Sequence, residues 1–212
     1  MKRISTVLFL FLIGCSPVYV PNMRNATLFE KKGDFKTTAY LVRSAEVQTA
    51  YALSNHFAVM ANGAITWDSK PPYFRYGELG AGYFTKVNQL NLEFFGGYGI
   101  GTTSSYFDQN VIGDFYKVYT TQAIGQREEQ IEWSFINRLS LVDFVTYPTD
   151  PERSATFYLE PAGYFGYSIV KDRFFGAAQF GVCYPLRRTA YFDYEPFSIS
   201  LGFTYRFGKR TQ

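Results

Sequence analysis

From about residue 35 to the end of the chain, large apolar residues alternate with small or polar residues at a period of two. This period is typical of a β-strand whose two faces meet different surroundings. The alternation is clearest in the last segment. Its apolar face carries Phe197, Ile199, Leu201, Phe203, Tyr205 and Phe207, and its other face carries Ser198, Ser200, Gly202, Thr204 and Arg206. We therefore predict an all-β chain.

The alternation predicts about ten strands separated by turn-forming residues. Their predicted ranges are 35–42, 45–53, 56–66, 74–85, 89–101, 114–126, 131–142, 156–168, 174–184 and 196–207. Four connections are tight, at 54–55, 86–88, 127–130 and 169–173, and four are longer, at 67–73, 102–113, 143–155 and 185–195. The turn at 42–44 is short for an outer loop, so the alternative count is eight strands.

Tight and long connections follow one another in the order expected of a transmembrane barrel, which has short periplasmic turns and long outer loops. An even number of antiparallel strands brings both ends of a barrel to one side, which here is the side of the tight turns. We predict an antiparallel up-and-down transmembrane β-barrel over residues 35–208, with both ends on the periplasmic side.

The two faces of the strands favour a membrane barrel over a soluble one. Glycines share one face with charged residues, and the other face is apolar. A soluble barrel has its charges outside, whereas a membrane barrel has them in the lumen, where glycines let a narrow wall curve. Isolated lumen charges are costly, so we expect Arg138 and Arg206 to neutralise some of the glutamates. The predicted lumen charge network is Glu78, Glu93, Glu132, Glu160, Arg138 and Arg206.

Several large residues interrupt the pattern. Phe95 falls on the glycine-bearing face, and the order of Ile136 and Asn137 reverses the alternation of their strand. Tyr158 and Phe175 also fall on the inner face. Ten strands enclose little space once these side chains occupy it. We expect a lumen plugged by side chains.

The N-terminus has the pattern of an export signal. A basic start, Lys2-Arg3, precedes the short apolar run 7–13, which is too short to span a bilayer. The segment Leu12-Ile13-Gly14-Cys15 resembles the lipobox of bacterial lipoproteins. That resemblance implies a signal peptide over residues 1–14 and a thioether-linked lipid on Cys15. The alternative is an ordinary secretory signal with an incidental cysteine.

Residues 15–34 hold two prolines and show no clear periodicity, so we interpret them as a lipidated tether. The opening Cys15-Ser16-Pro17-Val18-Tyr19-Val20-Pro21-Asn22 resembles the start of largely uncharacterised outer-membrane β-barrel lipoproteins of Bacteroidota. The acidic pair that sends such lipoproteins to the cell surface does not follow Cys15. The resemblance therefore implies an outer-membrane protein with its lipid anchor facing the periplasm.

Composition supports a membrane protein and narrows the chemistry. Aromatic residues make up 20% of the chain, which suits the apolar band and aromatic girdles of a barrel. The net charge of +3, without a basic run, gives no reason to expect nucleic acid as a partner. The only cysteines are Cys15 and Cys183, without metal-binding spacing, and the only histidine is His56, at a tight turn. We expect no enzyme activity, no metal and no cofactor beyond the covalent lipid at Cys15.

The long connections carry aromatic rings, which we expect to be exposed, and an arginine pair. Rings at such places bind proteins or glycans in some proteins and form an aromatic girdle in others. The arginines are candidates for contact with lipopolysaccharide phosphates. The loop interaction candidates are Tyr106, Phe107, Tyr147, Arg187, Arg188, Tyr191 and Tyr194. The long connections also carry the rings of Tyr73, Phe74 and Phe192.

Three functions fit the sequence. The first is an outer-membrane β-barrel lipoprotein with a structural or surface-interaction role, in contact with membrane lipid. The second is a narrow pore, or the membrane subunit of a larger transport or secretion complex of the outer membrane. The third is a periplasmic lipocalin-like lipoprotein that binds an apolar ligand inside its barrel, which requires the large apolar face to point inward.

Overall fold

A computed structural model describes residues 16–41, 44–67, 72–107, 111–147, 153–171, 173–187 and 192–207. Every regular element in these ranges is a β-strand. Across the same ranges, the structure has no helix with the length and apolar character needed to cross a membrane. The predicted signal peptide, residues 1–14, and Cys15 lie outside the described residues.

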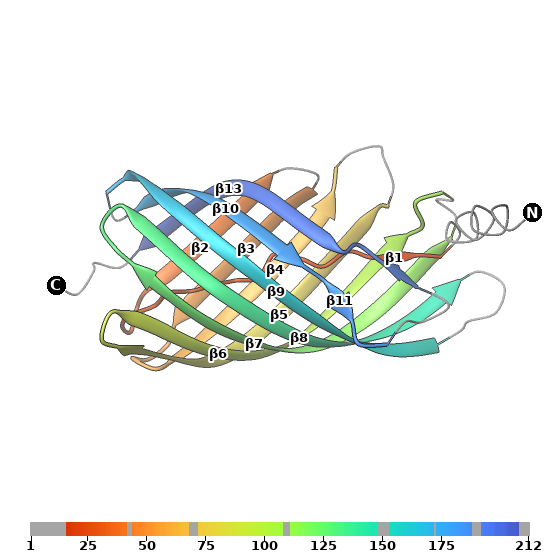
Figure 1. Cartoon of the computed structure of the whole chain (residues 1–212), viewed down its shortest axis with the longest axis horizontal. Coiled ribbons are helices and arrows are strands. Elements are labelled where there is room, and N and C mark those ends of the chain that lie inside the picture. Colours follow the sequence, from red (N-terminus) through yellow and green to blue (C-terminus); the bar gives the residue numbers. More distant parts are fainter. Residues whose placement is uncertain are drawn as a thin grey trace, which may run out of the picture.

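The fold is a closed, antiparallel, up-and-down β-barrel, as the sequence pattern predicts (Figure 1). Each long strand pairs with its neighbours in sequence, and the last wall strand, β13, pairs with the first, β2, which closes the wall. The ten wall strands are β2 (Phe35–Leu41), β3 (Ser44–Ala52), β4 (Phe57–Thr66), β5 (Phe74–Val87), β6 (Leu90–Ser104), β7 (Ile112–Arg127), β8 (Ile131–Tyr147), β9 (Arg153–Val170), β10 (Phe174–Val182) and β13 (Phe197–Phe207).

The barrel has two unlike ends. At the tight-turn end, short connections join β3 to β4, β5 to β6, β7 to β8 and β9 to β10. At the long-loop end lie the connections between β4 and β5, β6 and β7, β8 and β9, and β10 and β13, together with the short link from β2 to β3. The prediction of ten strands with this order of connections is confirmed.

The strands β6 to β9 extend further toward the long-loop end than the alternation predicts. The β7–β8 ladder continues to the pair Ile112–Tyr147, and the β8–β9 ladder continues to Val145–Arg153. These extensions are rich in β-branched and aromatic residues, which favour extended structure. The predicted loops at 102–113 and 143–155 are correspondingly shorter.

Three two-residue strands lie at the long-loop end. β11 (Tyr184–Pro185) pairs with β9 after a break at Cys183. β1 (Val18–Tyr19) and β12 (Asp193–Tyr194) pair with one another in parallel, apart from the wall. The N-terminal segment is thereby attached to the connection between β10 and β13.

The large apolar residues of the wall point outward and the charged residues point inward. Leu79, Ile199 and Phe197 expose 70%, 69% and 62% of their surface, whereas Arg138 and Glu160 are fully buried. Every long strand has outward large apolar residues, although some rings and aliphatic side chains point inward, such as Phe84, Phe95 and Ile136. The inward face of the barrel is therefore the polar face.

The interpretation of residues 15–34 as a tether is wrong for the described part, residues 16–34. This segment enters at the long-loop end, where Pro17 bridges Ser105, and runs through the lumen to the tight-turn end (the red trace in Figure 1). There the backbone of Gly33 donates to Ala52 O at 2.9 Å. Polar side chains of the inner wall bind this segment. The charges of the wall strands predicted a polar lumen, but they did not predict that the N-terminal segment fills it.

The two ends of the barrel wall, Phe35 and Phe207, lie on one side as predicted, but the expected position of the N-terminal segment on that same side is wrong. Ser16 lies at the long-loop end, whereas Phe207 pairs with Phe35 at the tight-turn end. Strand parity places only the two ends of the barrel wall together. The N-terminal segment adds one further passage through the lumen.

Candidate functional site: the lumen and its plug

The lumen is occupied by residues 17–29, which we call the plug. All of them except Val20 are fully buried. A closed barrel leaves no free strand edge, so the plug backbone cannot join the wall ladder. Its buried N–H and C=O groups still need partners, and side chains of the inner wall supply them.

Glu93 binds the plug near its C-terminal end, at Thr27 and Leu28. Its carboxylate accepts hydrogen bonds from the Thr27 amide at 3.0 Å, from the Thr27 hydroxyl and from the Leu28 amide. Arg206 Nη1 donates to Thr27 O at 2.7 Å. Two oppositely charged wall residues therefore hold the two sides of one plug peptide.

Two glutamine side chains bind the plug backbone as a strand neighbour would. Gln179 accepts from Arg24 N at 2.6 Å and donates to Arg24 O at 2.8 Å. Gln48 donates to Met23 O at 2.6 Å, and Glu46 accepts from Met23 N at 3.1 Å. These amide and carboxylate groups replace the missing β-ladder.

The side chain of Asn22 links the plug to a second charged group. Asn22 Nδ2 donates to Glu78 at 2.9 Å, and its Oδ1 accepts from Lys117 at 2.8 Å and Arg138 at 2.7 Å. Glu78 also forms an ion pair with Lys117, and Arg138 Nη1 lies 3.8 Å from Glu78. One plug amide thus completes a group of three buried charges.

The plug contributes one cation of its own. The Arg24 guanidinium lies 3.4 Å from Glu160 and donates to Ser198 Oγ at 2.8 Å. Tyr19 OH donates to the same Glu160 at 3.1 Å. A Cβ at Gly181 would lie 2.5 Å from Arg24 Nη1, so a larger residue there would displace this guanidinium.

The six residues predicted as a lumen charge network all lie buried on the inner face. Arg206 pairs with Glu132 at 2.8 Å, and Arg138 faces Glu78. Plug groups compensate the other two glutamates: backbone and hydroxyl donors at Glu93, and Arg24 and Tyr19 at Glu160.

Sequence reasoning missed six further buried charges among the described residues. The alternation could have identified Lys36, Glu46 and Lys117, which share the inner face, but Arg24 lies outside the strand pattern. Among the described residues, six buried acids match six buried bases: Asp34, Glu46, Glu78, Glu93, Glu132 and Glu160 against Arg24, Lys36, Lys117, Arg127, Arg138 and Arg206.

Apolar side chains of the plug pack in three clusters along the lumen. At the tight-turn end, Phe29 packs with Phe84 and Phe95, its ring centroid 5.8 Å from that of Phe84. Leu28 and its neighbours pack against Ile136 in the middle. The middle cluster is Met23, Ala26, Leu28, Tyr40, Ala123, Ile136, Tyr164 and Ala177.

The third cluster closes the long-loop end around Tyr19. The Tyr19 ring lies 4.8 Å from that of Tyr158, and Phe192 stacks on Phe144 at 3.9 Å between centroids. Phe192 comes from the connection between β10 and β13 and is buried, which corrects its interpretation as an exposed loop ring. Phe74 is buried as well.

Backbone hydrogen bonds hold the plug at the mouth of the barrel. Asp193 N donates to Pro17 O at 3.0 Å, and Glu195 N donates to Tyr19 O at 2.9 Å. Thr103 Oγ1 donates to Val18 O at 2.7 Å. Because strand-like pairing and a wall side chain both act here, the position of the plug at this end is well defined.

Those loop interaction candidates that the structure describes do not form a single surface patch. Phe107 is 79% exposed, Tyr106 is half-buried and Arg187 is exposed, on two different connections at the long-loop end. Tyr194 is half-buried, with its ring 6.2 Å from that of Tyr158 in the mouth. Tyr147 pairs through its backbone with Ile112, but its side chain, Arg188 and Tyr191 lie outside the described residues.

The two residues of most reactive type, His56 and Cys183, lie toward opposite ends of the barrel. His56 lies at the tight-turn end, stacked on Tyr83 with centroids 5.4 Å apart. Cys183 is buried in the apolar cluster around Tyr19. Such a thiol is a weak nucleophile. Within the described ranges, no three His, Cys, Asp or Glu side chains are grouped to hold a metal ion.

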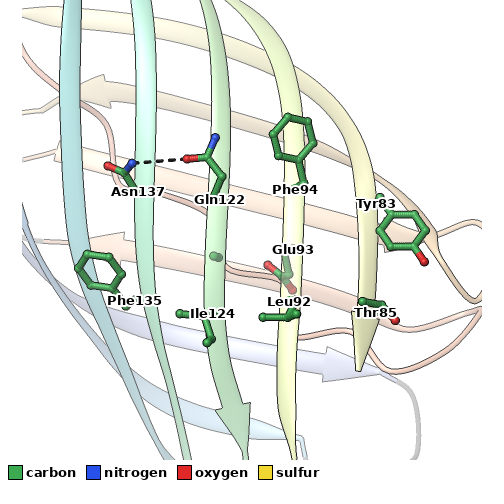
Figure 2. A pocket seen from close by; sticks show the side chains of 10 residues that line it. Tyr83, Thr85, Leu92, Glu93, Phe94, Gln122, Ile124, Phe135 and Asn137 are labelled. Carbon is green, nitrogen blue, oxygen red and sulfur yellow. Dashed lines mark hydrogen bonds between the residues drawn. The ribbon is translucent and has the colours of Figure 1, made fainter. Parts of the chain in front are cut away.

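The outer wall carries a shallow groove over strands β5 to β8 (Figure 2). Phe94, Phe135 and Ile124 line it, and Asn137 donates to Gln122 at 3.4 Å across two strands. Most of its lining consists of outward side chains of the wall, so this groove belongs to the apolar surface. The plug and its wall partners are the more specific arrangement. No protein-family profile matches this chain, and no curated protein matches it.

Proposed function

We propose that the protein is an outer-membrane β-barrel lipoprotein, sealed by its own N-terminal segment, with a structural or surface-interaction role and no catalysis. One observation carries this proposal: a closed wall exposes its large apolar residues outward and buries its charges inside. Membrane barrels have this distribution, because their outer face meets lipid and their lumen is polar.

The energetic argument rests on the outward rings and aliphatic side chains. Burial of apolar surface contributes about 25 cal/mol per Å², and Leu79, Ile199 and Phe197 leave most of theirs uncovered. Lipid covers such a surface completely around a barrel. The same face in water would form an apolar patch far larger than monomeric soluble proteins expose.

The plug supports a sealed barrel over an open one. Three apolar clusters cross the lumen, and hydrogen bonds hold residues 22–28 between them. A lipocalin-like carrier needs an apolar interior open to a ligand, whereas this interior is charged and occupied. The surface role therefore falls to the long-loop end, where exposed Arg187 is a candidate contact for lipopolysaccharide phosphates.

Gel mobility tests the proposal. The Cys15→Ala chain lacks the lipid as a reason for membrane association, so it is extracted from outer-membrane fractions and run with and without boiling. We expect it to remain in the membrane and to migrate faster unboiled, as a closed barrel does. A soluble Cys15→Ala chain without a heat-dependent shift would overturn the membrane barrel.

A gated pore, or a subunit of a transport complex, is the second candidate. The observation that favours it is the manner in which the plug is held: wall side chains bind its backbone between residues 22 and 29 without a β-ladder. A segment held in this way can leave without breaking the wall. Conductance of the intact protein, or co-purification with one large outer-membrane protein, would favour this candidate over a sealed barrel.

A further inference from the structure

Two amide side chains lie on the outer face of the wall, Gln122 on β7 and Asn137 on β8 (Figure 2). They come from residues that face each other in the β7–β8 ladder. Gln122 is exposed and Asn137 is half-buried, whereas Ile136 and Arg138 on either side of Asn137 are fully buried in the lumen. The alternation of β8 therefore directs an amide to the face that is otherwise apolar.

The two amides lie near the middle of the apolar band of the outer wall. Ile131 begins β8 at the tight-turn end, and the ion pair of Asp143 with Arg153 lies toward the long-loop end. Asn137 is halfway between Ile131 and Asp143, about 20 Å along the strand from each. At a strand tilt of about 40°, this is about 15 Å of height from either level, and the apolar band of a barrel is about 25 Å tall. In the proposed membrane barrel, both amides therefore face hydrocarbon.

The hydrogen bonds of this amide pair are incomplete. Asn137 Nδ2 donates to Gln122 Oε1, and Gln122 Nε2 donates to Thr120 Oγ1, each at 3.4 Å. A side-chain amide has two donor hydrogens and an acceptor oxygen, so Asn137 Oδ1 and one hydrogen of each amide have no partner among the described residues. Lipid tails offer neither donors nor acceptors, and polar groups without partners are costly in hydrocarbon. The amides therefore indicate a partner that brings polar groups to this depth.

We propose that this face of β7 and β8 is the interface of a homodimer, in which the Gln122–Asn137 pairs of two copies hydrogen bond to each other across a two-fold axis. The inference rests on the proposed membrane barrel and adds a partner to it. An amide is a donor and an acceptor at once, so a second copy supplies the groups that the first copy lacks. A two-fold interface requires such a self-complementary patch, and amide side chains join transmembrane helices in the same way.

The groove beside the amides is compatible with a second copy in charge and shape. Its charged lining residue, Glu93, directs its carboxylate inward to Thr27 and Leu28. The outer surface of the groove is therefore neutral, and two copies do not repel each other there. Phe94 and Phe135 expose 53% and 54% of their surface in the groove. In a two-fold interface these rings pack beside those of the other copy.

A second polar pair on the outer wall provides a matched control. The hydroxyls of Thr37 on β2 and Thr49 on β3 lie 3.4 Å apart, and both side chains are half-buried. A hydroxyl has a single hydrogen, so this pair leaves fewer donors unpaired than the amide pair does. The threonine pair therefore does not indicate a partner outside the chain.

Sedimentation equilibrium in density-matched detergent micelles measures the association of the full chain. We expect the intact chain to form dimers. The double variant Gln122→Leu/Asn137→Leu removes the amides and should raise the dimer dissociation constant at least tenfold, whereas Thr37→Val/Thr49→Val should leave it unchanged. Gel mobility with and without boiling, on the same samples, reports whether each chain forms the barrel. All three should keep the heat-dependent shift, because no lumen contact is changed.

The outcomes separate the homodimer from the membrane barrel. A monomeric intact chain that keeps the heat-dependent shift would overturn the homodimer and leave the membrane barrel in place; a lipid hydroxyl or a different protein would then have to meet the amides. A dimer that the amide substitutions do not weaken would overturn this interface as well. An intact chain without the heat-dependent shift would overturn the proposed function, and the homodimer with it.

Cross-linking in the membrane tests the position of the interface. Leu139→Cys, next to Asn137 on the outer face of β8, and Val59→Cys, on the outer face of β4, are made in a Cys15→Ala/Cys183→Ala background. The two native side chains are 37% and 38% exposed, so they are matched in accessibility. Outer membranes are treated with a short bismaleimide. We expect several-fold more product of twice the monomer mass from Leu139→Cys, and equal yields from the two variants would contradict an interface on β7 and β8.

Discussion

The two faces of the same strands differ in what they contact. The outward side chains of the wall, such as Leu79 and Ile100, meet a fluid apolar surrounding in the proposed membrane and have no fixed partner. The inward side chains, such as Glu93 and Ile136, meet one defined segment of the chain. A change on the outer face therefore tests compatibility with lipid, whereas a change on the inner face tests a specific contact.

Replacement of the plug should have the largest effect. A Gly-Ser segment of equal length in place of residues 17–29 removes three apolar clusters and the partners of Glu93 and Glu160. We expect the free energy of unfolding to fall by about 5 kcal/mol or more, since a single buried Phe→Ala change already costs about 3–5 kcal/mol. Urea unfolding of the refolded protein in detergent measures it.

The same variant should conduct ions. Loss of Arg24 leaves six buried acids facing five bases, so we expect channels with a weak preference for cations in a planar bilayer. The intact protein in the same bilayer is the control and should be closed. Equal conductance of the two proteins would contradict the sealing role of the plug.

The second-largest loss of stability is expected when a single inner charge is removed. Arg206→Met leaves Glu132 without its cation and Thr27 O without its donor. Loss of one partner of a buried ion pair costs about 3–5 kcal/mol, and we expect a loss of this size in urea unfolding. The double variant Arg206→Met/Glu132→Gln should recover part of it, because the buried acids and bases among the described residues are then equal in number again. A double variant as unstable as the sum of both single changes would argue against the pair.

The third-largest loss of stability is expected when a charge is introduced on the outer face. Leu79 is outward on β5, near the middle of the wall. Leu79→Arg should cost about 2–4 kcal/mol when the protein is folded into lipid vesicles, as charges at the midplane of barrels do. Leu79→Phe is the matched control and should be close to neutral. A neutral Leu79→Arg would indicate that this face does not meet lipid.

The sequence predicted the wall well, because the period of two reports directly on the two surroundings of each strand. It predicted the polarity of the lumen from Glu78, Glu93 and the other inner charges. It failed for residues 16–34, because an extended segment held by side chains has no periodicity of its own. Pro17 and Pro21 are typical of a loop, and the local sequence pattern of a loop outside a barrel does not differ from that of a segment inside it.

The exceptions to the alternation of apolar and polar residues are the positions where the plug packs against the wall. Phe95 breaks the pattern where Phe29 of the plug packs, and Ile136 breaks it where Leu28 packs. Large apolar residues on an otherwise polar lumen face therefore indicate an apolar occupant. Their partner was not identifiable from the sequence, because packing in the lumen joins residues about 66 to 108 positions apart in the chain.

The smallest predicted effect gives the sharpest contrast between the two faces, because the chemical change is identical. Ile136→Val removes one methylene beside Leu28, where the surrounding wall cannot collapse, so we expect a loss of about 0.5–1.5 kcal/mol in vesicle-based urea unfolding. Ile100→Val removes the same group from the outer face, where lipid tails as apolar as leucine fill the space. We expect this second loss to be smaller than the first. Equal losses would mean that the outer face is as tightly packed as the lumen, and a protein partner rather than lipid would then have to cover that part of the wall.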